Sequence, residues 1–508
     1  MILKINDGFF LLLFDDAYIH FEQARNILAG HYGHNPGEIS APNSSILWPF
    51  ILAPLTPLPF FEWAVLLLNL GIVIAIVRIQ YNIITPMFSR LPERLRTRRG
   101  QALRYLLLIS LIFIPNLILL LFSGMETPLQ ILLAHLILLG LIREHQTGRM
   151  PAYLTIALLL SPLIRYESLA LVCPALIRLF SRNHRAGSVL TGLIMGLTLF
   201  LFSYYLYRHG IGMLPTSITA KTIHQNGFGN PLRGLGINIF LNLTNPFSLP
   251  LILLLLSHVP ALTADRWRQY RGLAAVVFSA GGLHLIFGNI GPLPLFRYEA
   301  YILSLLAVSA AWIYLADTFR YPGGTMRAVF FGVMPFLVLS LPSLIITTLV
   351  PAISNAAYRH PYQMHRLITE FYPYPAAIND LGWVTYKNSA YVLDLWGVGS
   401  IEALRCGIQR DSLSCVARLA REKGVRLVMI TSAWFKNVPG VWIKIGEYYP
   451  GKNPPLLDPF VRGIVNHVDV YVTDQRYRQE AIEAIGAFNR TLPRGAEFIF
   501  SPSADNPG

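Results

Sequence analysis

The stretch FEWAVLLLNLGIVIAIVRIQYNI, residues 61–83, has the length and composition of a membrane-spanning helix. About 20 apolar residues in a helix cross the hydrocarbon core of a bilayer. Comparable runs recur through the first 350 residues, so the sequence predicts a polytopic α-helical membrane protein with about 11 transmembrane helices. The predicted spans cover residues 1–14, 61–83, 104–122, 128–142, 151–164, 167–180, 187–207, 246–263, 272–290, 299–316 and 328–350.

The composition supports this fold class. Of the 508 residues, 54% are hydrophobic and 13% are charged, whereas soluble proteins carry about 25% charged residues. This difference excludes an ordinary soluble enzyme and a disordered chain. The formal net charge is +14, but the basic excess lies between apolar runs, where it orients a membrane protein. We therefore expect membrane lipid, and no nucleic acid, as a partner.

Arginine clusters fall in alternate loops between the predicted spans. By the positive-inside rule these loops face the cytoplasm. With an odd number of spans, the N-terminus is then cytoplasmic and everything after residue 351 is periplasmic or extracytoplasmic, in an inner (cytoplasmic) membrane. The clusters are Arg90–Arg104, Arg143 with Arg149, Arg178–Arg185, Arg266–Arg271 and Arg320 with Arg327.

Three apolar segments are irregular. The first span has only about 14 residues before Asp15. Residues 151–180 contain two short spans that meet at Arg165-Tyr166-Glu167, an arrangement that membranes tolerate where helices line a cavity. The segment from Ser45 to Pro59 is too short and too rich in proline to cross, and it is predicted to form an interfacial helix on the outer face.

The character of the chain changes near residue 352. Short apolar runs at 391–394, 425–430 and 468–472 are typical of buried strands. Apolar residues three and four apart predict helices over 411–423 and 477–490. The sequence therefore divides into a transmembrane domain, residues 1–351, with a first outer loop at 15–60, and a soluble extracytoplasmic α/β domain, residues 352–508.

Ionisable residues near membrane segments are expensive and often functional. Asp15 and Asp16 lie side by side at the outer end of the first predicted span. Two adjacent carboxylates repel each other, which raises one pKa, and such a carboxylate can take a proton from an alcohol. Alternatively, the pair is a solvated loop start that simply terminates the first helix.

Further charged candidates fall on the same predicted side. Arginine in particular can bind a phosphate through two parallel hydrogen bonds. Each candidate also has a plainer role: a helix N-terminal acid, an ion pair between Arg165 and Glu167, or a solvated loop cation. These candidates are Glu126, Arg165, Glu167, Lys221 and Arg297.

Several motifs of this chain, in order, resemble the GT-C superfamily of integral-membrane glycosyltransferases, and in particular the terminal arabinofuranosyltransferase-like group. The first outer loop contributes Asp15-Asp16-Ala17-Tyr18-Ile19 and Ser44-Ser45-Ile46-Leu47-Trp48. Further motifs are Ser123-Gly124-Met125-Glu126-Thr127-Pro128, Arg165-Tyr166-Glu167, Ala220-Lys221-Thr222, Arg297-Tyr298 and Asn379-Asp380-Leu381-Gly382. The group more commonly has Thr-Asn-Pro or Thr-Ser-Pro where this chain has Ser44-Ser45-Ile46.

The resemblance implies a GT-C fold and a function in cell-envelope biogenesis. A sugar would pass from a polyprenyl-phosphate donor to a glycan or glycolipid acceptor at the outer face. Asp15 matches the catalytic carboxylate, and Asp16 the acid that often follows it. The resemblance places the other candidates in substrate or donor binding, with the cations at the donor phosphate. They are Glu126, Arg165, Glu167, Lys221, Arg297, Tyr298, Ser44 and Trp48.

A nucleotide site is not expected, since the sequence has no GxGxxG motif and no P-loop. The sequence predicts no other cofactor and leaves the use of a divalent metal open. Two other classes share part of these features: a transporter or flippase of lipid-linked sugars, and a membrane-anchored envelope assembly or binding protein.

Cysteine use gives one further expectation. Cys406 and Cys415 fall in the predicted outer domain, where an oxidising compartment favours a disulfide. The alternative is that both are small buried residues of unconnected elements. Cys173 lies in a predicted span and should stay a free thiol.

Overall fold

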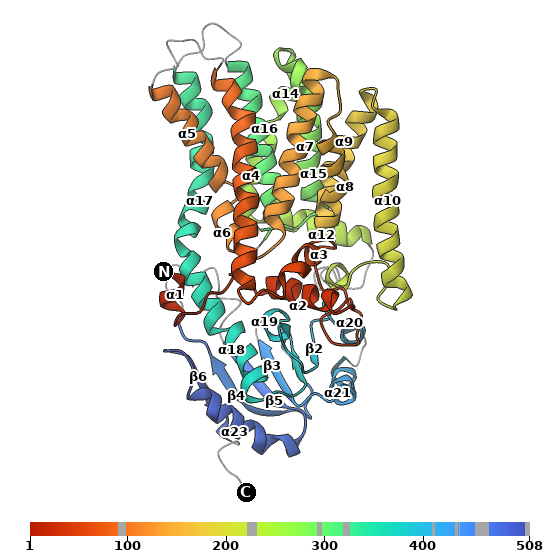
Figure 1. The fold of residues 1–508 in the computed structure, drawn as a ribbon, viewed down its shortest axis with the longest axis vertical. Helices are drawn as coiled ribbons and strands as arrows, with labels where there is room; N and C mark the ends of the chain where they lie inside the picture. The colour runs from red at the N-terminus through yellow and green to blue at the C-terminus, as the bar shows by residue number, and fades with distance from the viewer. Residues whose placement is uncertain are drawn as a thin grey trace.

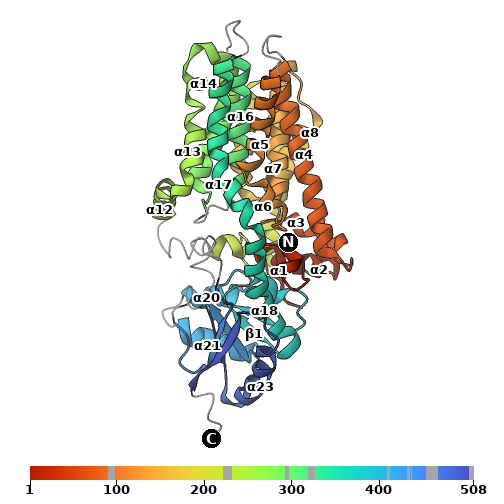
Figure 2. The same cartoon turned by 90° about the vertical axis from the view of Figure 1, so that its left-hand side faces the viewer.

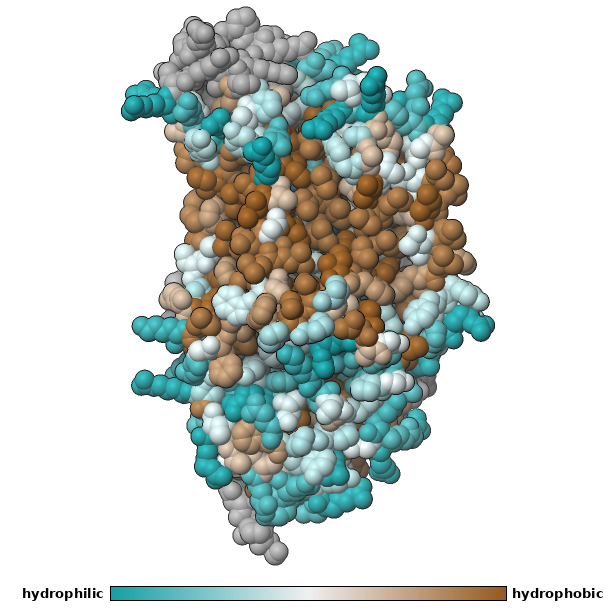
Figure 3. Space-filling view, in the orientation of Figure 1, coloured by the Kyte–Doolittle hydropathy of each residue, from teal (hydrophilic) through white to brown (hydrophobic). Residues whose placement is uncertain are grey.

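The protein consists of a long helical bundle and, at one end of it, a domain built on a six-stranded sheet (Figure 1, Figure 2). On the face shown in Figure 3, a hydrophobic band covers the middle of the bundle, with hydrophilic residues above and below it. An apolar surface of this extent is typical of a membrane contact. This computed structural model describes residues 1–89, 98–220, 231–291, 297–318, 326–408, 412–431, 435, 437–452 and 467–502.

The regular secondary structure described within the first 359 residues is entirely helical. Short helices precede the bundle: α1 (Ile2–Ile5), α2 (Asp16–Leu28), α3 (Trp48–Leu52) and the 3-10 turn η1 (Ala53–Leu55). The bundle is formed by α4 (Phe61–Ser89), α5 (Arg98–Phe113), α6 (Leu117–Leu121), α7 (Thr127–Thr147), α8 (Ala152–Ile164), α9 (Leu169–Ser181), α10 (Arg185–Arg208), α12 (Pro231–Thr244), α13 (Leu249–Leu256), α14 (Val259–Thr263), α15 (Arg271–Phe287), α16 (Ala300–Thr318) and α17 (Met326–Arg359).

Several of these helices are suited to cross a bilayer, as expected of a multi-pass membrane protein. Among the described residues, five helices are long and apolar enough by themselves, and a pair bent by 43° at residue 349 makes a sixth. The prediction of about 11 spans is therefore not confirmed. The five are Phe61–Phe88, Thr127–Thr147, Arg185–Arg208, Pro246–Thr263 and Asp265–Phe287.

Broken helices account for part of the difference. The predicted span 104–122 is interrupted at Asn116, whose backbone is left-handed with φ of 57°. The helices α8 and α9 have 13 residues each, about 20 Å at 1.5 Å per residue, so each is shorter than the bilayer core. They meet at Arg165, as the sequence predicts.

The first predicted span is wrong. The one-turn helix α1 ends at Ile5, and no helix follows until Asp16. The apolar residues between them pack against protein instead: Leu12 is fully buried, and the Leu13 N–H donates to the Phe122 carbonyl at 3.0 Å. The N-terminus therefore lies at the same end of the bundle as the sheet domain (Figure 1), not at the opposite end as expected.

The sheet domain follows α17 without a break. The predicted domain boundary at 351/352 falls inside this helix, near Pro351. The domain contains α18 (Pro361–Arg366), η6 (Leu367–Phe371), β1 (Ala376–Ile378), α19 (Gly382–Thr385), β2 (Val392–Asp394), α20 (Ile401–Ile408), α21 (Ser412–Glu422), β3 (Leu427–Thr431), β4 (Ile443–Tyr449), β5 (Val468–Val472), η7 (Gln475–Tyr477), α23 (Arg478–Asn489) and β6 (Glu497–Phe500).

The strand order is β2-β1-β3-β5-β4-β6, with the first three strands parallel and the others antiparallel. The predicted strands appear as β2, β3 and β5, and the predicted helices as α21 and α23. The strands β1, β4 and β6 were not predicted. The strand β1 is buried but has only three residues, whereas β4 and β6 include partly or fully exposed positions, so their apolar pattern is weak.

The expected disulfide between Cys406 and Cys415 is present, with 5.5 Å between the Cα atoms. It joins α20 to α21, and Cys173 is free. Because the bridge closes a loop of about ten residues, its removal should cost the sheet domain about 2–3 kcal/mol. Intact-mass measurement after alkylation should find one labelled cysteine before reduction and three after it. Three labelled cysteines without reductant would contradict the bridge.

Candidate functional site

The helix α2 brings the predicted carboxylates to the junction of the two domains. It lies between the bundle and the sheet domain (Figure 1), and Asp15 is its N-cap residue. The Asp15 carboxylate accepts hydrogen bonds from the backbone N–H groups of Gly382 at 2.9 Å and Trp383 at 2.6 Å. Asp15 is thus bound to the first residues of α19, 367 positions away along the chain.

Asp16 is in a different situation. Its side chain is 41% exposed and forms an ion pair with Arg297, which is 15% exposed. The Arg297 guanidinium also lies against the rings of Phe14 and Tyr298, at 5.4 and 5.1 Å from their centroids. Its Nε is buried and has no hydrogen-bond partner among the described residues. Asp16 is therefore the accessible member of the predicted carboxylate pair.

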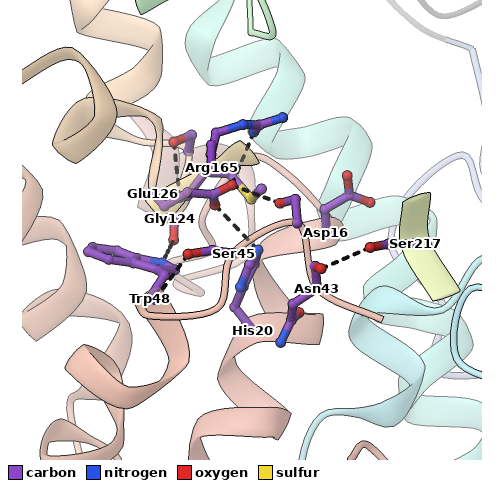
Figure 4. A network of polar contacts seen from close by, with 12 residues as sticks. Asp16, His20, Asn43, Ser45, Trp48, Gly124, Glu126, Arg165 and Ser217 are labelled. Atoms are coloured by element: carbon purple, nitrogen blue, oxygen red, sulfur yellow. Dashed lines mark hydrogen bonds and ion pairs between the residues drawn. The ribbon is translucent and has the colours of Figure 1, made fainter. Parts of the chain in front are cut away.

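Arg165 lies at the tip of the α8–α9 hairpin and is almost fully buried. Its guanidinium donates to Glu126 at 3.0 Å and to Glu167 at 2.9 Å. Glu126 also accepts from Ser44 at 2.7 Å, and His20 Nε2 lies 3.3 Å from it. Figure 4 shows Arg165 and His20 converging on Glu126.

In this network Arg165 is already paired with protein carboxylates. A buried charge must be paired to be tolerated, and here Glu126 and Glu167 supply the counter-charges of Arg165. The ion-pair alternative for Arg165 and Glu167 is therefore realised in this structure. Tyr298 connects the network to Arg297, because both guanidinium groups lie near its ring, that of Arg165 at 5.6 Å.

Two of the predicted binding residues are not placed in the site. Trp48 is fully buried, and its indole N–H donates to the Gly124 carbonyl at 3.2 Å. It therefore supports the loop that carries Ser44 and has no surface for a substrate. Lys221 lies outside the described residues, so its predicted contact with a phosphate stays a prediction.

Two residues of this region, His20 and Asp380, were not predicted as site residues. His20 is buried four positions after Asp16, on the same face of α2, and this spacing was the available signal. Asp380 was noted only as part of a motif, but its side chain forms a hydrogen bond with Asp15. No local sequence pattern predicts this contact, because the two residues belong to different domains.

The carboxyl groups at the junction have unusual proton affinities. Burial raises the pKa of Asp15 to about 7, and the nearby Asp16 charge adds to this effect, whereas the hydrogen bonds from Trp383 and Gly382 oppose it. Burial and the Asp15 charge raise the pKa of Asp380 well above its ordinary value. Groups with shifted pKa values are frequent at functional sites.

Asp15 and Asp16 do not form a free ligand set for a metal ion. A divalent cation prefers several free carboxylate or carbonyl oxygens, but both Asp15 oxygens accept N–H groups and Asp16 is paired with Arg297. Elsewhere in the described residues, Glu447, His467 and Asp469 come close together. The ammonium group of Lys444 lies 2.6 Å from Glu447 and 2.7 Å from Asp469, which already balances these acids.

Comparison with known protein families gives a match for part of the sheet domain. Residues 351–485 match a family described as "Domain of unknown function (DUF8728)". This segment runs from the end of α17 into α23 and includes Asp380 and Gly382. No curated protein matches the chain.

Proposed function

We propose that this protein is a glycosyltransferase that moves a sugar from a polyprenyl-phosphate donor to a cell-envelope glycan or glycolipid at the outer face of the membrane. The observation that carries the proposal is the pair of Asp16 and Arg297. A partly exposed carboxylate and a guanidinium whose buried Nε has no hydrogen-bond partner among the described residues lie together at the start of α2, between the bundle and the sheet domain (Figure 1). Transfer from a polyprenyl-phosphate sugar needs an apolar surface for the lipid, a cation beside it for the phosphate, and a base for the acceptor hydroxyl.

The chemistry follows from the pairing. When the donor binds, its phosphate takes the place of Asp16 on Arg297, through two parallel hydrogen bonds. The released Asp16 carboxylate accepts the proton of the acceptor hydroxyl, whose oxygen forms the new bond to the anomeric carbon. The bond from this carbon to the phosphate oxygen breaks, and Arg297 stabilises the charge on the departing lipid phosphate.

The other residues of the site hold this arrangement. Arg165, neutralised by Glu126 and Glu167, fixes the hairpin tip beside Tyr298. Tyr298 in turn presents a ring face to Arg297. We therefore assign these four residues to the positioning of Arg297 rather than to direct contact with phosphate.

Analysis of envelope glycans tests the reaction. In a strain that lacks the protein, mass spectrometry should show the loss of one type of glycosyl residue, which wild-type protein restores and the Asp16→Asn variant does not. Transfer by purified protein in detergent would exclude transport between two compartments as the primary role. Unchanged glycans, together with no transfer from any polyprenyl-phosphate sugar, would refute the proposal.

Replacement of Arg297 by Met tests the phosphate contact. A hydrogen-bonded charge pair contributes about 1.5–3 kcal/mol, so affinity for a sugar-free polyprenyl phosphate should fall about 10- to 100-fold. The matched control is Arg208→Met, at an exposed position at the end of α10. Equal affinities of wild type and Arg297→Met in a direct titration would place the phosphate elsewhere, with Lys221 as the next residue to replace.

A further inference from the structure

The carboxyl ends of β1 and β2 face the bundle. These strands are parallel, with Ile378 opposite Asp394, so the residues that follow them meet at one edge of the sheet. Asp380 comes two residues after β1, and Asp394 is the last residue of β2. The edge is closed by α2, because Asp15 binds the N–H group of Gly382.

Asp394 is held within its own loop. Its carboxylate accepts from the N–H groups of Trp396 at 2.9 Å and Gly399 at 2.6 Å. Asp380 instead forms its side-chain hydrogen bond with Asp15, across the domain junction. Two carboxyl groups can form a hydrogen bond only when one of them carries a proton, since two carboxylates offer acceptors alone.

The surrounding charges favour a retained proton. Asp16 and Asp394 are the other acids that act on this pair. The cation Arg297 is engaged by Asp16. Like charges this close raise the affinity of the pair for one proton, as in other carboxyl pairs that share a site.

We propose that Asp380 is a positioning residue of the site: its carboxyl group shares one proton with Asp15, and this bond docks the sheet domain on α2. The shared proton limits the negative charge beside Asp16, so Asp16 remains the ionised acid that meets Arg297. The site thus includes a residue of the sheet domain, Asp380, beside Asp15, Asp16 and Arg297. The inference rests on the proposed function only for what Asp16 does chemically.

The pH dependence follows from the direction of the pKa shifts. Burial raises the pKa of Asp15 to about 7 and that of Asp380 further above its ordinary value. A raised pKa in the docked state means that docking is most stable at low pH and weakens as the pH rises through these values. One released proton changes the docking equilibrium by up to about tenfold per pH unit.

Hydrogen exchange in the full-length protein measures docking without any substrate. The protection of the amides of α19, relative to their intrinsic exchange rates, should fall in wild type as the pH rises from about 5 to about 9, above the ordinary carboxyl pKa and through the raised one. In Asp380→Asn the amide still donates to Asp15 and cannot ionise, so protection should stay level over this range. In Asp380→Ala the donor is lost, and protection should fall about tenfold or more at every pH. Asp265→Asn, at a position 97% exposed, is the matched control and should behave as wild type.

Infrared spectroscopy detects the proton itself. At pH 7.5 the difference spectrum of wild type minus Asp380→Asn should contain the carbonyl band of a protonated carboxyl group, which titrates away at alkaline pH. Absence of this band, or identical pH profiles of exchange in wild type and Asp380→Asn, would overturn the proposal. If the variants fail to fold, the wild-type titration decides alone, because level protection over the whole range from about pH 5 to about pH 9 would exclude the shared proton. Neither measurement needs turnover, so a failure of the proposed function would not affect them.

Discussion

Asp16→Asn is expected to lower glycosyl transfer about 100-fold or more, the usual contribution of a general base. The amide keeps the shape of the side chain and can still contact Arg297, but it cannot accept the proton of the acceptor hydroxyl. Because Asp16 is 41% exposed and the site is otherwise unchanged, folding should be unaffected. Initial rates with saturating donor measure the effect, and binding of polyprenyl phosphate should change far less than turnover.

Asp15→Asn provides the informative comparison. The resemblance matches Asp15 to the catalytic carboxylate, but in the structure its carboxylate binds the start of α19. We therefore expect Asp15→Asn to reduce activity together with the protection of the α19 amides, whereas Asp16→Asn should leave this protection intact. Near-normal turnover by a folded Asp16→Asn protein, with strong loss in a docked Asp15→Asn protein, would reverse the two roles.

Gly382→Ala is expected to separate the sheet domain from α2. A Cβ atom at this position would lie 2.1 Å from the Asp15 carboxylate and 2.3 Å from the Asp15 backbone oxygen. The backbone contact cannot be relieved by a side-chain rotation, so the junction must open. Overpacking of this kind typically costs about 1–3 kcal/mol, and the protection of the α19 amides should fall accordingly, together with activity.

Gly486→Ala is the matched control for this substitution. Gly486 lies inside α23, and a Cβ atom there would meet nothing within 4 Å. Because alanine favours a helix over glycine by about 1 kcal/mol, this variant should be at least as stable as wild type in thermal unfolding. If Gly382→Ala kept full amide protection and activity, the close packing of Asp15 on α19 would not exist in solution.

The pattern of apolar residues along the sequence was enough to predict the helices and strands whose formation depends on neighbouring residues alone. Helices such as α4 and α10 were predictable because a long apolar run in a membrane must satisfy its backbone within a helix. The strands β3 and β5 were predictable from short apolar runs. The break at Arg165 was also predictable from the sequence, because a charged pair between two short apolar segments interrupts the apolar run that a continuous span needs.

Only the tertiary structure decided whether an apolar run meets lipid or protein. The run before Asp15 resembles a span, but Leu12 and its neighbours are buried against α2 and the bundle. Hydropathy measures transfer out of water and does not distinguish these two destinations. Trp48, which the resemblance placed at the substrate, is likewise buried against protein, and its indole N–H donates to Gly124.

Only the tertiary structure also decided which role each residue of the site has. The sequence predicted Asp15, Asp16 and Arg297 as candidates from their residue types and motif order. Asp15 and Gly382 are 367 positions apart, and Asp16 and Arg297 are 281 apart. Which carboxylate is anchored and which stays accessible depends on these long-range contacts, because burial and hydrogen bonding, not residue type, set the chemistry of a carboxyl group.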